Sequence, residues 1–229
     1  MRSIKVIAFD ADDTLWVNEP YFQETEHRFC ALLEDYLPHH SIAQELFKTE
    51  IQNLALYGYG VKGFILSMVE TALRVSNNTV SISVIEKALQ YGKDLLEKPI
   101  ELLDGVEDIL NEFKHNFRLV VATKGDLLDQ ERKLKKSGIE HYFHHIEIMS
   151  DKGERDYQKL LRHLDIKPDE FLMIGNSLKS DVLPVLDIGG YAIHIPYHTT
   201  WAHEKIEQTI VNDRFMQANS LREIPPFFS

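Results

Sequence analysis

Residues 7–15 read IAFDADDTL, an apolar run that ends abruptly in carboxylates. The residues from Ile4 to Phe9 are almost continuously apolar, which is typical of a strand buried on both faces of a parallel sheet. Asp10 and Asp12 therefore begin where this strand leaves the core. In open α/β sheets, that edge is where ligands bind.

Carboxylates on alternate residues offer two chemical functions. Asp10 is suited to attack phosphorus, and Asp12 is suited to act as general acid and base for the leaving group and for water. Crowded acids repel each other, and a hard cation such as Mg²⁺ compensates for this through carboxylate and carbonyl oxygens. Taken alone, the segment also fits an acidic turn after a buried strand.

Two later segments repeat the pattern of an apolar strand that ends in polar residues. Residues 119–125 read LVVATKG, and the Thr123 hydroxyl and nearby backbone amides can donate to phosphate oxygens. Lys124 is a further candidate for binding phosphate. Lys152 follows a strand-like segment and can neutralise both Asp10 and a transferring phosphoryl group. The alternatives are a capped turn at Thr123 and an ordinary surface lysine at position 152.

A third segment, residues 171–181, reads FLMIGNSLKSD. Asn176 and Asp181 are oxygen ligands in the right place for the same cation, although Ser180 or Asp181 could instead cap the next helix. The four segments together are far more specific than any one of them, because each is a strand end and all would converge on one sheet edge.

These segments resemble the four ordered motifs of the haloacid dehalogenase superfamily of phosphohydrolases. The matching residues are Asp10-Ala11-Asp12-Asp13-Thr14, Thr123, Lys152 and Gly175-Asn176-Ser177 through Asp181. The resemblance spans essentially the whole chain. It implies that Asp10 forms an aspartyl-phosphate and that Asp12 is the general acid and base.

The resemblance also implies the binding roles. Asp10, the backbone carbonyl of Asp12, and the loop from Asn176 to Asp181 would hold Mg²⁺, while Thr123 and Lys152 would hold the phosphoryl group. The chain departs from the family where the usual first aspartate of the fourth motif is Asn176, which should weaken Mg²⁺ binding or shift coordination to Asp181. It also has Gly153 where proline is common.

The expected function is that of a Mg²⁺-dependent phosphatase acting on a small phosphorylated metabolite. The dehalogenase branch of the superfamily works without Mg²⁺ and usually lacks the second carboxylate, so Asp12 argues for phosphoryl transfer. Two alternatives remain open. A phosphomutase would pass the same intermediate to a sugar hydroxyl, and a catalytically weak phosphate-binding or regulatory protein would account for Asn176.

The alternation of strands and helices predicts an α/β fold with a doubly wound parallel sheet. The resemblance implies that the long helical insertion between the first two motifs is an α-helical cap that closes over the site. We expect residues 1–17 and 101–229 to form the catalytic core and residues 18–100 to form the cap. Strands are expected near 4–10, 118–123, 144–149, 171–175 and 191–195. Within the cap, Ser41 with Gln44 and Ser83 with Glu86 fit capping boxes.

Two segments are candidates for contact with substrate. Residues 56–63 read LYGYGVKG, and we expect Tyr57 and Lys62 to bind substrate there, although a plain connection between helices fits nearly as well. Residues 194–204 carry three histidines and a tryptophan in a spacing that fits no familiar zinc pattern. A packed, hydrogen-bonded loop beside the site is the better interpretation of that segment.

Composition narrows the classes of protein. A net charge of −11 over 229 residues speaks against a general affinity for nucleic acid. No apolar stretch is long enough to cross a bilayer, so a cytoplasmic location with no membrane partner is expected. The single cysteine, Cys30, cannot form an internal disulfide. The basic run at residues 132–136 is predicted to be a solvated helix end.

Overall fold

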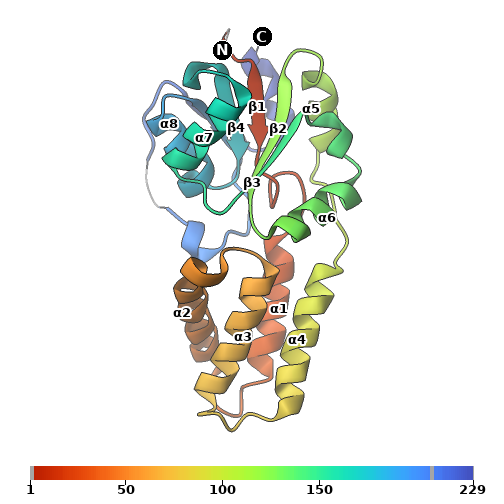
Figure 1. Cartoon of the computed structure of the whole chain (residues 1–229), viewed down its shortest axis with the longest axis vertical. Coiled ribbons are helices and arrows are strands. Elements are labelled where there is room, and N and C mark those ends of the chain that lie inside the picture. The colour runs from red at the N-terminus through yellow and green to blue at the C-terminus, as the bar shows by residue number, and fades with distance from the viewer. Residues whose placement is uncertain (1–2, 207–208, 229) are drawn as a thin grey trace. The chain divides into compact units, whose positions relative to one another are not determined.

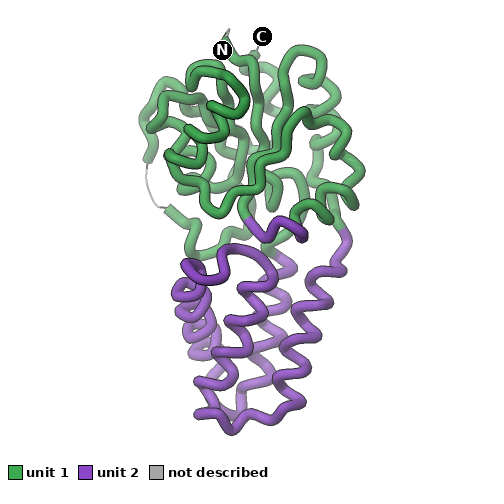
Figure 2. Tube along the Cα trace, in the orientation of Figure 1, with its two compact units in different colours: residues 1–19, 100–124, 130–229 green, residues 20–99, 125–129 purple. Residues whose placement is uncertain are grey.

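The computed structural model describes residues 3–206 and 209–228 (Figure 1). These residues form two compact units, which are coloured separately in Figure 2. Unit 1 comprises residues 1–19, 100–124 and 130–229, and unit 2 comprises residues 20–99 and 125–129. Unit 1 has two apolar cores, one on each face of its sheet, and unit 2 has one.

Unit 1 is built on a parallel sheet with the strand order β3-β2-β1-β4-β5-β6. The strands are β1 (Val6–Phe9), β2 (Arg118–Lys124), β3 (His145–Met149), β4 (Phe171–Gly175), β5 (Tyr191–His194) and β6 (Phe215–Gln217). The predicted α/β class and parallel sheet are confirmed. The sixth strand was not predicted from the sequence.

Helices cover both faces of this sheet, which is why its central strands β1 and β4 are apolar without alternation. Successive strand residues enter opposite cores: Ile7 and Phe9 join one, and Val6 and Ala8 join the other. The first core is completed by α5 (Val106–Phe113) and α6 (Leu127–Ser137), and the second by α7 (Glu154–Leu164) and α8 (Leu183–Asp187).

Short helical turns complete unit 1. They are η1 (Glu140–Tyr142), η2 (Pro168–Glu170), η3 (Leu178–Val182), η4 (Ala202–Glu204), η5 (Leu221–Glu223) and η6 (Pro225–Phe228), of which η3 is a π-helical turn.

The strand order reverses direction at β1, which lies between β2 and β4. Phe9 is in register with Val121 of β2 and with Ile174 of β4, so Asp10 follows directly at the carboxyl edge of the sheet. A doubly wound sheet opens a crevice at such a reversal, because its crossover connections depart in opposite directions. Polar side chains at this edge can approach one another without replacing apolar side chains of the core.

Unit 2 is helical. Its helices are α1 (Glu19–Ala31), α2 (His39–Tyr57), α3 (Val61–Val75) and α4 (Ile82–Leu96). Their buried faces form one core around Phe29, Leu46 and Met68. The helices α3 and α4 approach closely at Gly92, where an added Cβ would lie 2.1 Å from Ile65 Cγ1. Cys30 is buried in this core, and burial raises the pKa of its thiol to about 12.

The two predicted capping boxes are wrong. Ser41 lies inside α2, which begins at His39 directly after Pro38, and Ser83 lies inside α4, whose N-cap is Ser81. At α2 the N-cap is Pro38, which precedes the predicted Ser41. At α4 the N-cap is Ser81, a second serine that precedes the predicted Ser83. Segment 56–63 connects two helices, since α2 ends at Tyr57 and α3 begins at Val61.

Over the described part of the chain, we find no helix that is both long and apolar enough to cross a bilayer.

Candidate active site

Asp10 lies one residue beyond β1, and its backbone N–H donates to Ile174 O at 2.9 Å. Its carboxylate is buried. Lys152 Nζ donates to one carboxylate oxygen, and Thr14 Oγ1 donates to the other at 3.1 Å. The same Thr14 hydroxyl lies 3.4 Å from Asn176 Oδ1, so the first and fourth predicted segments meet here.

Lys152 also donates to Asp181 Oδ1 at 2.7 Å, and its own side chain is 1% exposed. The second oxygen of Asp181 accepts the backbone N–H of Ser177 at 2.9 Å. A glycine at position 175 permits this arrangement, because an added Cβ would lie 2.2 Å from Asp181 Oδ2. One buried ammonium group is thus shared between two buried carboxylates.

The shared lysine sets the electrostatics of the cluster. Burial opposes the charge on Lys152, but Asp10 and Asp181 outweigh it and raise the pKa of the ammonium group. Burial raises the pKa of Asp10 to about 7, because the attraction of Lys152 is partly offset by the charge of Asp181. Once Asp10 is ionised, two carboxylates against one ammonium leave a net negative charge at this edge of the sheet.

That excess charge is suited to a hard cation. The oxygen donors that meet there are the carboxylates of Asp10 and Asp181 and the amide oxygen of Asn176. Within the described residues, no three His, Cys, Asp or Glu side chains are grouped to hold a metal ion. Carboxylate and amide oxygens are of the kind that Mg²⁺ binds.

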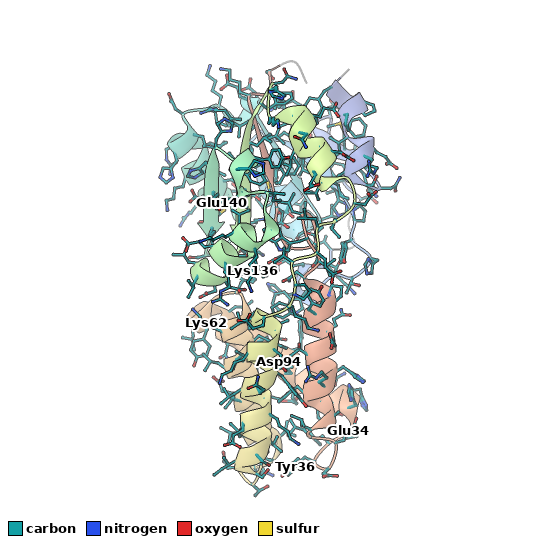
Figure 3. All side chains as sticks on the ribbon, turned by 90° about the vertical axis from the view of Figure 1, so that its right-hand side faces the viewer. Glu34, Tyr36, Lys62, Asp94, Lys136 and Glu140 are labelled. Carbon is teal, nitrogen blue, oxygen red and sulfur yellow. The ribbon has the colours of Figure 1, made fainter. Side chains whose placement is uncertain are left out.

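Asp12 lies outside this cluster. Its Oδ1 accepts from Trp16 Nε1 at 2.8 Å and from Lys133 Nζ at 2.9 Å, and its Oδ2 accepts from Gln130 Nε2 at 2.8 Å. The basic run at residues 132–136, predicted to be a solvated helix end, lies in the last turns of α6, but Lys133 departs from that prediction because it contacts Asp12. Its side chain is 15% exposed, whereas Lys136, labelled in Figure 3, is exposed on the same helix.

The third acid of the segment, Asp13, has a structural role. It adopts φ +61°, and its carboxylate accepts the backbone N–H groups of Asn18 at 2.8 Å and Glu19 at 2.9 Å. These are donors at the start of α1 that have no partner inside the helix. Burial raises the pKa of Asp13 to about 8 despite these two hydrogen bonds.

Thr123 and Lys124 lie at the carboxyl end of β2. The Thr123 hydroxyl is buried and donates to Lys124 O at 3.3 Å, while Gln130 Nε2 lies 3.3 Å from it as a donor. Gln130 thereby connects Thr123 with Asp12. Lys124 Nζ donates to Ser180 Oγ at 2.8 Å and to Glu204 Oε1 at 2.8 Å.

Glu204 accepts hydrogen bonds from residues at the end of β2 and in the turn after β4. Its Oε2 accepts from the hydroxyls of Ser177 and Ser180, each at 2.6 Å, and its Oε1 accepts from Lys124. Burial alone would raise its pKa, but the charge of Lys124 and these hydrogen bonds lower the pKa to about 2. Lys179 Nζ also donates to His203 O at 3.0 Å, so the segment after β5 is a hydrogen-bonded loop.

Tyr57 and Lys62, the predicted substrate ligands of the cap, belong to unit 2. Tyr57 donates to Glu70 Oε1 at 3.3 Å. Lys62, labelled in Figure 3, lies in the first turn of α3 and pairs with Asp126 at 2.9 Å. Their roles in binding substrate stay predictions.

Sequence reasoning missed Gln130, Lys133 and Trp16 as neighbours of Asp12. Gln130 and Lys133 are three residues apart, which places them on one face of a helix that follows the second strand. That spacing could have indicated that the two side chains act together. The local sequence does not show which strand end this face of the helix packs against. Glu204 lies in the segment 194–204, which was considered for its histidines and its tryptophan. The glutamate at its end was not identified as a partner of Lys124.

A model of the haloacid dehalogenase-like hydrolases matches residues 4–189. The chain is similar to the glyceraldehyde 3-phosphate phosphatase of Methanopyrus kandleri, with 26% identity over 78% of this chain and 78% of that protein. It is also similar to the enzyme of that name from Pyrococcus furiosus, with 23% identity over 86% of this chain and 82% of the relative. A haloacid dehalogenase-like hydrolase from Xanthomonas campestris, with 36% identity, superimposes with a TM-score of 0.85 over 95% of this chain and 87% of that structure.

The family match covers most of the chain, including the strand ends that carry Asp10, Thr123, Lys152 and Asp181. The relatives from Methanopyrus kandleri and Pyrococcus furiosus, which share most of their length with this chain, are phosphatases by name. The chain therefore belongs to the haloacid dehalogenase-like hydrolases, and it is a hydrolase of phosphoric monoesters.

Proposed function

We propose that this phosphatase is Mg²⁺-dependent and hydrolyses a small phosphorylated metabolite through an aspartyl-phosphate on Asp10. The observation that carries the proposal is the buried group of Asp10, Lys152 and Asp181 at the reversal point of the sheet. Its unbalanced negative charge suits a divalent cation, and its lysine suits a phosphoryl group.

In the first step, the Asp10 carboxylate attacks phosphorus, and the bond from phosphorus to the leaving oxygen breaks. Asp12 gives its proton to that oxygen, so the alcohol leaves neutral. Lys152, with the hydroxyl of Thr123, holds the phosphoryl oxygens as charge spreads over them. In the second step, Asp12 takes a proton from water, the water oxygen attacks phosphorus, and inorganic phosphate leaves as the Asp10 carboxylate is restored.

Asp10, Asp181, Asn176 and the Asp12 carbonyl would hold Mg²⁺. When bound, the cation supplies positive charge that lowers the repulsion between the anionic nucleophile and the phosphate.

We also propose that the cap, residues 18–100, recognises the substrate, with Tyr57 and Lys62 as candidate ligands. Lys124 is a further candidate for binding the phosphoryl group, although its pairing with Glu204 would first have to loosen. Because relatives are named glyceraldehyde 3-phosphate phosphatases, that triose phosphate is the first compound to test.

The test is hydrolysis of an aryl phosphate, glyceraldehyde 3-phosphate, phosphoglycolate, a hexose phosphate and a nucleotide, with and without Mg²⁺. The native protein is compared with Asp10→Asn, and the Asp10 peptide is examined by mass spectrometry for a phosphoryl group after quenching. Metal-dependent turnover that the substitution abolishes is the expected result. Turnover that persists in folded Asp10→Asn, or equal turnover without metal, would contradict the proposal.

A further inference from the structure

Among the residues that the structure describes, three donors hold the Asp12 carboxylate, and they divide unequally between its oxygens. Trp16 Nε1 and Lys133 Nζ both donate to Oδ1, while Gln130 Nε2 is the only one of the three that donates to Oδ2. A carboxylate oxygen offers two lone-pair positions. Both positions of Oδ1 are therefore occupied, and Oδ2 keeps one position for a proton. The Asp12 side chain is still 25% exposed, so it remains open to a reacting group.

The orientation of Gln130 is fixed by what its amide nitrogen meets. Nε2 donates to Asp12 Oδ2 and to Lys124 O, at 2.8 and 2.7 Å, and both of these atoms act here as acceptors. The reversed amide would place oxygen against oxygen. The cost is that Oε1 is buried and accepts from no described group. A buried unpaired acceptor destabilises the fold, so stability does not explain a glutamine at this position.

Lys133 is held in place as well. Its Nζ donates to Asn18 Oδ1 at 2.7 Å in addition to Asp12. Asn18 is in turn connected to the Asp13 carboxylate through its backbone N–H. Lys133, on α6, therefore contacts two residues of the segment that follows β1, Asp12 and Asn18.

We propose that Trp16, Gln130 and Lys133 are positioning residues that fix the Asp12 carboxyl with Oδ2 as the oxygen that gives and takes the proton. The inference rests on the proposed function, in which Asp12 is the general acid and base. Transfer of a proton to a leaving oxygen depends on a near-linear approach, so a carboxyl group that rotates freely loses much of its catalytic effect.

The experiment compares kcat/KM for an alkyl phosphate and for nitrophenyl phosphate. A nitrophenolate leaves without a proton, whereas an alkoxide does not, so only the alkyl ester reports proton donation in the first step. The variants are Lys133→Met and Gln130→Met, with Lys133→Arg as the conservative replacement. Lys135→Met is the matched control, because Lys135 is an exposed basic residue of the same helix.

We expect Lys133→Met and Gln130→Met each to lower kcat/KM for the alkyl ester by about 10- to 100-fold, a part of what general acid catalysis contributes. The nitrophenyl ester should change by less than about threefold, since its barrier includes no proton transfer. Lys133→Arg should recover part of the loss, and Lys135→Met should behave as the native protein. Adding Lys133→Met to Asp12→Asn should cause no further loss.

The outcomes separate the two proposals. If Asp12→Asn slows both esters equally, Asp12 is not the general acid and the proposed function fails together with this inference. If Asp12→Asn discriminates between the esters but folded Lys133→Met and Gln130→Met slow both equally, the positioning role is overturned while the proposed function stands. Thermal unfolding of each variant establishes that it is folded, and the two substitutions act on different oxygens, so each tests the inference separately.

Discussion

At the scale of single residues, the site depends on one lysine that serves two carboxylates. Lys152 contacts both Asp10 and Asp181, and all three side chains are buried. Removing one partner of a buried ion pair leaves uncompensated charge, which typically costs about 3–5 kcal/mol of unfolding free energy. We therefore expect Lys152→Met to lower the stability of the metal-free protein at pH 8 by about 3 kcal/mol and to lower kcat by about 100-fold or more.

The loss of stability should depend on pH with a definite sign. Without Lys152, the folded state favours protonated carboxyls, so their folded pKa lies above the unfolded value and stability falls as pH rises. The destabilisation by Lys152→Met, measured by thermal unfolding in EDTA, should thus be smaller at pH 5 than at pH 8. The double variant with Asp10→Asn should recover part of the loss at pH 8. A loss that is equal at both pH values would contradict this account.

Residues at strand ends were the ones that the sequence could predict. Asp10, Lys152 and Asp181 meet in the structure because parallel strands bring their carboxyl ends to one edge, and the apolar runs before them could be read directly. The contacts of Asp12 could not be predicted in this way. They depend on how α6 packs on the sheet, which no local pattern encodes.

At the scale of elements, Glu204 joins the turn after β4 to the end of β2 through Lys124, Ser177 and Ser180. Its folded pKa of about 2 lies below the unfolded value of about 4.3, so it stabilises the fold above that value and loses the effect as pH falls toward 2. The shift corresponds to about 3 kcal/mol. Glu204→Gln should lower the melting temperature at pH 7, and the difference from the native protein should narrow below about pH 5.

The control for this prediction is Glu112→Gln, at an exposed position on α5. It should change the melting temperature little at any pH, since isolated surface charges contribute little to stability. A deficit of Glu204→Gln that stays constant from pH 7 to pH 4 would show that its carboxylate is not the source of the stability.

The end of β4 offers a second test at this scale. In Gly175→Ala, the added Cβ would lie 2.2 Å from Asp181 Oδ2 and force that side chain away from Lys152. We expect a loss of about 1–3 kcal/mol in unfolding free energy and a marked loss of activity. In the control Gly153→Ala, the Cβ would lie 3.4 Å from Asp156 Oδ2, an ordinary contact. Equal losses in thermal unfolding for the two variants would contradict the prediction.

Elements were predicted best where they are long and buried on both faces. The strands β1, β2, β4 and β5 were identified from apolar runs and β3 from a strand-like segment, whereas β6 has three residues, Phe215–Gln217, too few to show a period. Helix starts were less predictable, as Ser41 and Ser83 show. The observed N-caps lie earlier than the motifs indicated, by three residues at Pro38 and by two at Ser81.

At the scale of the whole molecule, the two segments by which the chain leaves unit 1 and returns to it, residues 15–17 and 101–103, are hydrogen-bonded to each other through their backbones. Val17 N–H donates to Glu101 O at 3.0 Å, Leu103 N–H donates to Leu15 O at 2.9 Å, and Trp16 bridges to Leu102. All of these residues belong to unit 1, so its two connections are held together by hydrogen bonds of its own. The long insertion therefore does not interrupt the sheet or its two cores.

We expect unit 1 to fold without the insertion if residues 20–99 are replaced by a short Gly/Ser linker. Its sheet and both cores are built from its own residues, and the connection points are already paired. Circular dichroism should show a cooperative thermal transition with both helix and strand signals. The matched control is the same linker inserted at residue 20 with the helices retained. A shortened chain with no cooperative transition, while the control unfolds normally, would mean that unit 1 requires the insertion to fold.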